Sequence, residues 1–242
     1  MRALGIETAT SIASVGIVVE NQVAAERTLP LRGSHARTLL PLIEETLHGA
    51  GLGLSDLELL AVSIGPGSFT GLRIGLSVAK GLALATGLPV VGVPTLEAYA
   101  RAAGARAGLV CPVLDARKGE VYGAAFRWQD GEPRCIAAPV AVAPAQFAIR
   151  LDMPCTLIGD GVDAYAELWR SALGPAAELV PFATLPPSGA TVARLGCARA
   201  AVATDDVDAL EPQYCRASEA ELGHQRRRTA AADAATEAVG KN

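Results

Sequence analysis

The sequence has no long hydrophobic run. Half of its 242 residues are hydrophobic, but no stretch of about 18 uncharged apolar residues occurs, which is the length that a membrane-spanning helix needs. The residues after Met1 have the pattern of a strand rather than of a secretory leader. We therefore expect a cytoplasmic protein that makes no membrane contact and buries its core as one large domain or as two lobes of roughly 100 residues.

Paired cysteine and histidine motifs are also missing. The three histidines, His35, His48 and His224, are too dispersed along the chain to predict a metal site from their spacing. The cysteines contain no C-x-x-C pair, which argues against a zinc ribbon and against a disulfide framework. We interpret them as reduced thiols that serve as small buried hydrophobes. The five cysteines are Cys111, Cys135, Cys155, Cys197 and Cys215.

An excess of positive charge is absent as well. The formal net charge is -4, whereas a protein that binds tRNA alone normally carries a basic patch that releases counterions from the phosphates. The densest basic run is Arg226 to Arg228, and it opens an alanine-rich end of the chain. We expect residues 224–242 to be a solvated, mobile tail.

Hydrophobic periodicity predicts an α/β order in the first half of the chain. Three successive strands are followed by helices and strands in alternation. Pro41 lies inside the first helical pattern, where it either kinks the helix or belongs to its first turn. The predicted strands span 3–8, 15–20, 23–29, 59–64 and 90–93, and the predicted helices span 34–48, 72–86 and a segment from Thr95.

The same order returns in the second half, which indicates a duplication. Two copies of strand, strand, strand, helix, strand, helix, strand, helix predict an α/β fold with two lobes, each a mixed sheet flanked by helices. This is the layout of the actin, Hsp70 and sugar-kinase fold. We place the lobes at 1–105 and 106–223, because two glycines interrupt the pattern between Gly104 and Gly108. The predicted second-copy strands span 110–114, 120–128, 134–140, 156–159 and 178–180, and the helices span 144–151, 162–173 and 189–203.

A glycine-rich segment between a buried strand and a long helix is the most informative part of the sequence. Glycines permit positive φ and close backbone approach, and the N–H groups at the start of the next helix can receive an anion. The segment is neither a P-loop nor a dinucleotide fingerprint, because no G-K-[ST] closes it and its third glycine comes one residue late. A structural turn and an anion site both remain open. The segment reads Gly65, Pro66, Gly67, Ser68, Phe69, Thr70, Gly71, Leu72, Arg73, Ile74 and Gly75.

The helix after this segment is apolar nearly all round. Small residues recur every four positions beside a bulky stripe of Ile74, Val78 and Leu82. One stripe can pack on the sheet and the other suits the close approach of a second helix, from a partner or from the chain itself. We predict that the partner interface includes Leu72, Gly75, Leu76, Ala79 and Ala83, together with His35, Leu39 and Ile43 of the preceding helix.

These segments resemble the TsaB (YeaZ) family. The resemblance rests on the glycine segment and on the strand at residues 4–10, which reads Leu-Gly-Ile-Glu-Thr-Ala-Thr. It extends to His35 with the run Leu39 to Ile43, to the segment Asp115 to Tyr122, and to the pattern Pro212-x-Tyr214-x-Arg216. It covers most of the chain apart from residues 124–209 and the tail.

The resemblance implies a role in making threonylcarbamoyladenosine on tRNA. Proteins of this family are required beside TsaD, a related transferase that carries out the catalysis, and beside TsaE, a separate ATPase. They are described as lacking an active site of their own. The resemblance therefore implies a non-catalytic scaffold that meets tRNA only through the complex and forms a homodimer when alone.

The sequence agrees with that implication where metal chemistry would be expected. TsaD-like proteins carry His-x-x-x-His shortly after the strand that follows the glycine-segment helix, and two histidines one helical turn apart can share a metal ion. The corresponding positions here are Thr95 and Tyr99. We predict no metal site and no catalytic residues, because no serine or cysteine lies in a nucleophile motif either.

Nucleotide chemistry is the remaining test. Active members of this fold place a carboxylate at the end of the first strand of each lobe, and Glu7 and Asp115 occupy those positions. The loop after Glu7 has no glycine to wrap a phosphate, so we interpret Glu7, Thr8 and Asp115 as a vestigial nucleotide site and expect no cofactor. The first alternative is an ATPase or small-molecule kinase that uses Glu7, Asp115 and the glycine segment. The second is a metalloprotease, which the missing histidine pair disfavours.

Overall fold

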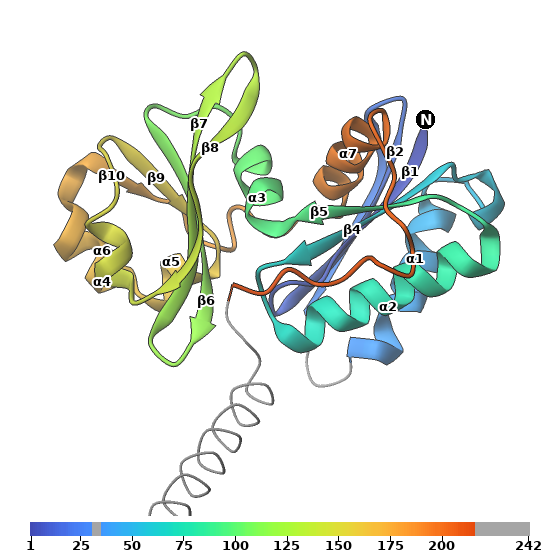
Figure 1. The fold of residues 1–242 in the computed structure, drawn as a ribbon, viewed down its shortest axis with the longest axis horizontal. Helices are drawn as coiled ribbons and strands as arrows, with labels where there is room; N and C mark the ends of the chain where they lie inside the picture. Colours follow the sequence, from blue (N-terminus) through green and yellow to red (C-terminus); the bar gives the residue numbers. More distant parts are fainter. Residues whose placement is uncertain (31–34, 216–242) are drawn as a thin grey trace, which may run out of the picture.

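The computed structural model describes residues 1–30 and 35–215, and Figure 1 shows two lobes side by side, each built on one sheet. The strands of the first sheet are β1 (Arg2–Glu7), β2 (Ile12–Val19), β3 (Gln22–Pro30), β4 (Leu59–Gly65) and β5 (Val90–Pro94). Those of the second are β6 (Leu109–Arg117), β7 (Glu120–Gln129), β8 (Glu132–Val142), β9 (Cys155–Ile158) and β10 (Ala177–Leu179). The helices are α1 (His35–Gly49), α2 (Phe69–Thr86), α3 (Thr95–Ala103), α4 (Pro144–Ala148), α5 (Asp160–Ala164), α6 (Ala166–Leu173) and α7 (Gly189–Ala200), with short 3₁₀ helices at Leu54–Asp56 and Gly174–Ala176.

The two sheets have the same topology. The first has the strand order β3-β2-β1-β4-β5 and the second the order β8-β7-β6-β9-β10. In each sheet the three first strands form an antiparallel meander and the last two add in parallel. The predicted duplicated actin, Hsp70 and sugar-kinase fold is therefore confirmed.

Strand alternation decides which helices cover which face of the first sheet. Leu4 and Ile6 of β1 point into a core that α1 and α2 complete, and Ala3 points to the opposite face, against α7. The side chains on the α7 face are small, and a Cβ added to Gly5 would lie 2.0 Å from the carbonyl oxygen of Gly189. Because of these glycines the backbone of α7 lies directly against the sheet.

Two helices are exchanged between the lobes, because each packs on the sheet of the other half of the chain. Leu96 and Ala100 of α3 pack on the second sheet, although α3 follows β5 of the first. In return, α7 follows β10 of the second sheet and packs on the first. The boundary near residue 105 therefore separates the two sheets but not the helices that cover them. An ion pair between Glu97 of α3 and Arg199 of α7, at 2.6 Å, joins the exchanged helices.

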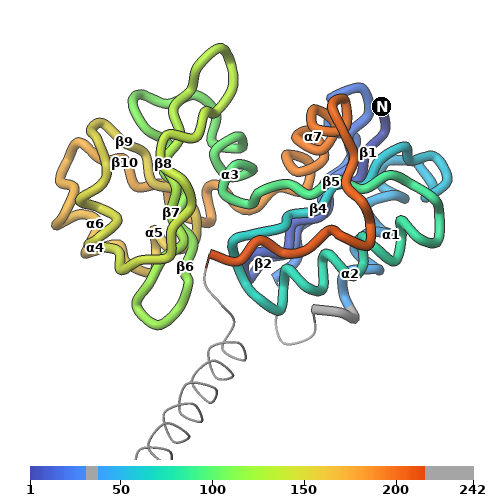
Figure 2. Tube along the Cα trace, viewed as in Figure 1, coloured from blue at the N-terminus to red at the C-terminus, as the bar shows by residue number. Residues whose placement is uncertain are grey.

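After α7 the chain returns along the first lobe as a strap, residues 201–215, which Figure 2 draws in red beside α2. Asp205 forms an isolated bridge with Val90, Leu210 is buried in the first core, and the amide of Gln213 donates to the carbonyl of Ile64 at 2.6 Å. The predicted tail at residues 224–242 lies outside the described residues.

Two smaller points complete the fold. The helix predicted at 162–173 is interrupted at Tyr165, whose φ of -129° and ψ of 30° end α5 before α6 begins. Among the described helices, none combines the length and the apolar character that crossing a bilayer requires.

Candidate functional site

The glycine segment is packed between the turn after β1 and the strap. The amide of Gly65 donates to Oγ1 of Thr95 at 3.1 Å, and its φ is +117°. A Cβ on Gly65 would lie 2.4 Å from the carbonyl oxygen of Gln213, and one on Gly67 would lie 2.6 Å from Cβ of Ala9. These glycines are therefore required for close approach within the chain.

Hydrogen bonds within the chain also occupy the start of α2. Ser68 caps the helix by accepting from the amide of Gly71 at 3.2 Å, and its own amide donates to the carbonyl of Ala9 at 2.7 Å. Thr8 lies beneath this turn and donates through Oγ1 to the carbonyl of Gly71 at 2.9 Å. Of the two interpretations left open by the sequence, these contacts favour the structural turn over an anion site.

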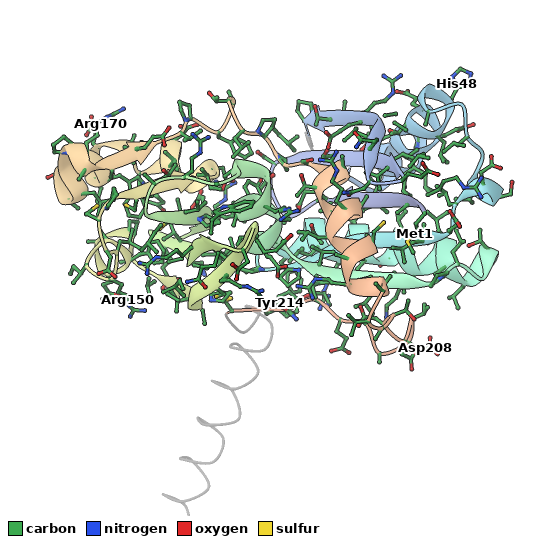
Figure 3. The ribbon with its side chains drawn as sticks, turned by 90° about the horizontal axis from the view of Figure 1, so that it is seen from above. Met1, His48, Arg150, Arg170, Asp208 and Tyr214 are labelled. Carbon is green, nitrogen blue, oxygen red and sulfur yellow. The ribbon has the colours of Figure 1, made fainter. Side chains whose placement is uncertain are left out.

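Three side chains form a stack on the surface where α2 meets the strap. The guanidinium of Arg73 lies 4.0 Å from the centroid of the Phe69 ring, and its Nε donates to the hydroxyl of Tyr214 at 3.1 Å. The rings of Phe69 and Tyr214 stack with centroids 5.3 Å apart. In Figure 3, Tyr214 lies near the middle of the molecule, where the two lobes meet. Both segments were recognised in the sequence, but the sequence did not predict that they are in contact.

The predicted partner interface requires a correction. On α2, Leu72, Gly75, Leu76, Ala79 and Ala83 are buried, and on α1 Leu39 and Ile43 are buried as well. All seven face the interior of the first lobe, and a Cβ on Gly75 would lie 2.3 Å from Oγ1 of Thr8. His35 begins α1, but its side chain lies outside the described part of the chain. Because α2 is apolar nearly all round, periodicity could not identify the side that faces the sheet.

The outer face of the same two helices is exposed and partly apolar. Leu40 of α1 is 50% exposed, and Leu82 of α2 is partly buried. Between the helices lies a groove of about 570 Å³ whose apolar lining includes Leu40, Pro41, Leu47, Leu52, Leu54 and Leu82. This face, rather than the small-residue stripe, is available to another molecule.

Glu7, at the end of β1, is enclosed by its own lobe. One carboxyl oxygen accepts from the amide of Ala9 at 2.6 Å, and the other accepts from the hydroxyl of Ser63. Burial raises the pKa of Glu7 to about 7, and both hydrogen bonds only partly oppose that rise. A carboxyl that is buried and about half protonated at pH 7 is a poor ligand for the magnesium ion of a bound nucleotide.

The two positions that correspond to histidines in TsaD-like proteins lie on α3 and have structural contacts. Thr95 is fully buried and accepts from Gly65, as described above. Tyr99 is buried in the core that α3 forms with the second sheet, and burial raises its pKa well above the usual range, with the negative charges of Glu7 and Asp160 adding to the effect.

Asp115, the corresponding acid of the second lobe, is held by its own hairpin. Its carboxylate accepts from the amide of Arg117 at 2.8 Å, pairs with the guanidinium of Arg117 at 3.0 Å and accepts from the hydroxyl of Tyr165 at 3.3 Å. Asp160, which sequence reasoning missed, accepts from the amide of Asp115 at 2.9 Å. Burial is the main cause of its raised pKa. The signal for Asp160 was its place directly after β9, at the carboxyl end of a parallel strand.

These acids do not assemble a metal site in the described part of the chain. No group of three or more histidine, cysteine, aspartate or glutamate side chains there is arranged to hold a metal ion. Glu7 and Asp115 accept hydrogen bonds from amides two residues further along the chain, and Thr8 donates to the carbonyl of Gly71 in α2.

Comparisons with known proteins identify the family. The family model described as TsaD, tRNA N6-adenosine threonylcarbamoyltransferase, matches residues 30–224. The tRNA threonylcarbamoyladenosine biosynthesis protein TsaB of Escherichia coli is 36% identical over 180 residues, which are 71% of this chain and 77% of that protein. TsaB of Bacillus subtilis is 30% identical over 224 residues, 91% of this chain and 96% of that protein.

A solved structure agrees with these relatives. YeaZ from Pseudomonas aeruginosa superposes with a TM-score of 0.75 at 29% sequence identity, over 88% of this chain and 99% of the YeaZ chain. Sequence and structure thus match the same group of proteins over most of both lobes. The chain belongs to the TsaB (YeaZ) family.

Proposed function

We propose that this protein is a non-catalytic subunit of the cytoplasmic machinery that forms threonylcarbamoyladenosine in tRNA, and that it acts by holding a TsaD-like catalytic partner. The observation that carries the proposal is that Thr95 and Tyr99 have structural contacts within the protein. Where TsaD-like proteins have two histidines, one side chain here accepts a hydrogen bond from the glycine segment and the other is buried in the core against the second sheet.

We place the partner surface on the outer face of α1 and α2. This face combines the exposed Leu40 with an apolar groove, and an exposed apolar helix face favours association. A related catalytic subunit of the same fold is the proposed occupant, and a second copy of this chain occupies the face when the partner is absent. The proposed complex also contains a TsaE-like ATPase, and tRNA is contacted only through the complex.

Substitutions on this face test the proposed surface. We expect Leu40→Glu combined with Leu82→Glu, two residues that line the groove, to weaken binding of the TsaD-like subunit by at least about 30-fold, or about 2 kcal/mol, because two charges would be buried without partners. Calorimetry gives the affinity. The matched control is Ile149→Glu, an equally drastic change at a residue that is 86% exposed on the second lobe. Undiminished binding by a folded double variant would remove this surface from the proposal.

Reconstitution tests the role itself. Purified partners, tRNA, threonylcarbamoyl adenylate and ATP are combined with or without this chain, and the modified nucleoside is measured. We expect product only when the chain is present, and no product from the chain alone. Turnover by the chain alone, or product formed equally well without it, would contradict the proposal.

Nucleotide binding separates this proposal from the kinase or ATPase alternative. The expectation is that Mg²⁺ and ATP leave the thermal unfolding midpoint of the isolated chain unchanged, because Glu7, Thr8 and Asp115 are engaged within the protein. A ligand that binds only the native state must raise its stability. A magnesium-dependent rise in the midpoint would therefore favour the enzyme.

A further inference from the structure

A second groove lies beside the end of the strap, and both lobes contribute to it. Its volume is about 600 Å³. The first lobe supplies the edge strand β5 and the last turns of α7, and the second supplies Glu132, with Glu97 of α3 between them. Much of the lining is apolar, including Leu195 and Val202, and Val202 is 90% exposed. We call this site the strap groove.

The strap groove contains backbone and side-chain groups without hydrogen-bond partners among the described residues. The amide of Gly92 in β5 donates to a carboxyl oxygen of Asp205 at 2.7 Å. The N–H and C=O groups of one strand residue point to the same side, so the carbonyl of Gly92 also faces the groove, and no described donor reaches it. Nε of Arg199 is buried without a partner, although another nitrogen of the same guanidinium pairs with Glu97. An occupant that pairs with these groups would remove the cost of leaving them unpaired.

The strap beside this groove is strongly acidic. Four of the seven residues from Asp205 to Glu211 are carboxylic acids, and none is basic. All four acids are exposed, and none forms an ion pair with another described residue. Lys80 of α2 donates to the backbone carbonyl of Asp208 at 3.2 Å, so one positive charge lies near four negative charges. This imbalance favours a cationic occupant.

The segment of chain that follows the strap has the complementary charge. Gln213 lines the groove, and the described part of the chain ends two residues later, at Cys215. Residues 216–228 contain four arginines and two glutamates, which give a net charge of +2 with His224 neutral. Three of the arginines are consecutive, at positions 226–228, and Leu222 is the one large apolar residue of the segment.

We propose that residues 216–228 fold back into the strap groove. Leu222 packs on Val202 and Leu195, and the arginines at 226–228 lie on the acidic strap. The docked segment contacts elements of both lobes, so it braces them against each other. The sequence alone predicts a solvated, mobile tail after residue 223, and the proposal replaces that expectation as far as residue 228.

Covalent attachment favours this segment over a separate basic protein or a second copy of the chain. Arg226 follows Gln213 by 13 residues, and a flexible chain of that length has a root-mean-square end-to-end distance of about 20 Å. The basic run therefore stays close to the strap, at an effective concentration in the millimolar range. Even weak intrinsic contacts are populated under that condition.

Trypsin cleavage after the arginines at 226–228 tests the docking in the full-length protein. Each cleavage rate is divided by that of a synthetic peptide with the same residues 213–230, because a docked site is cleaved only while it is released. We expect cleavage in the protein to be at least about tenfold slower than in the peptide at low salt. The difference should shrink in about 0.5 M sodium chloride, which screens exposed charges.

Variants locate the docking. Leu222→Ser should speed cleavage at least about fivefold, because the apolar anchor is lost. Asp208→Asn combined with Glu211→Gln should speed it at least about threefold, because two exposed charge contacts are lost. The matched control is Asp152→Asn combined with Glu167→Gln, the same change of charge at exposed residues of the second lobe, and it should leave the rate unchanged.

The outcomes distinguish the occupant from its alternatives. Wild-type protein cleaved as fast as the peptide would overturn the docking. Protection that survives in both Leu222→Ser and the strap variant, or that the control variant also loses, would overturn its place in the strap groove. Protection that increases with protein concentration would mean that the segment enters a second copy, and would overturn the intramolecular proposal. Circular dichroism spectra check that each variant is folded.

Discussion

Glu7 ends β1 in surroundings that disfavour its charge. The side chain is 1% exposed, and its pKa of about 7 compares with 4.5 for a solvated glutamate. A group whose pKa is raised on folding gives stability that is fully present below its unfolded pKa. That stability is lost as the pH rises through the folded value. Between pH 4.5 and 7 the folded protein keeps a proton here that the unfolded chain has released.

We predict that Glu7 lowers the free energy of unfolding by about 3 kcal/mol between pH 4.5 and pH 7.5, since each pKa unit corresponds to about 1.4 kcal/mol. Glu7→Gln keeps an acceptor for the amide of Ala9, offers its NH₂ group to the hydroxyl oxygen of Ser63, and removes this dependence. Urea denaturation of both proteins across that range measures the effect. The wild-type value minus the variant value should fall with pH. A difference in the free energy of unfolding that does not change with pH would mean that Glu7 has the same pKa in the folded and unfolded protein.

At the scale of single elements, α2 shows how glycines within one helix can have opposite roles. Gly71 and Gly75 lie against Thr8, and a Cβ on either would be 2.0 or 2.3 Å from a Thr8 oxygen. Gly81, on the outer face, has no atom within 4 Å of such a Cβ. Glycine lowers helix stability in both settings, but only the inner positions require it.

Alanine substitutions on the two faces should therefore have effects of opposite sign. We expect Gly75→Ala to destabilise the protein by about 1–3 kcal/mol through overpacking against Thr8. Gly81→Ala should stabilise it by up to about 1 kcal/mol, the difference in helix propensity. Chemical denaturation gives both values. Equal effects of the two substitutions would show that Thr8 moves aside without cost.

The sequence predicted most elements well because their patterns are local. The predicted strand at 59–64 and helix at 72–86 differ from β4 and α2 by only one to three residues at their ends. The inner face of α2 was not predictable, since Leu72 and Leu84 are equally apolar and only the tertiary structure buries one and exposes the other. Asp160 and the Phe69, Arg73 and Tyr214 stack were missed because they depend on contacts between distant segments.

For the whole molecule, the exchange of α3 and α7 means that neither lobe is one continuous stretch of chain. Without α7, the face of the first sheet that carries Ala3, Val18, Leu59 and Val91 would be open to water. The strap also contributes Leu210 to the other core of that lobe. Burial of these surfaces is part of what stabilises the fold.

We predict that a fragment of residues 1–105 does not unfold cooperatively and aggregates at room temperature. Joining residues 1–94 through a flexible glycine and serine linker to residues 186–215 should restore a sharp thermal transition, because α7 and the strap return. Circular dichroism melting and gel filtration make the comparison. A monomeric 1–105 fragment with a transition as sharp as that of the joined fragment would show that the first sheet folds without α7.

The late position of α7 in the chain has a consequence for biosynthesis. A ribosome adds about 5–20 residues each second, so the first sheet leaves the exit tunnel on the order of ten seconds before the helix that closes it. During that interval the apolar face of the nascent sheet that α7 later covers is exposed to solvent. Folding of the first lobe is completed only after α7 and the strap, residues 189–215, have been translated.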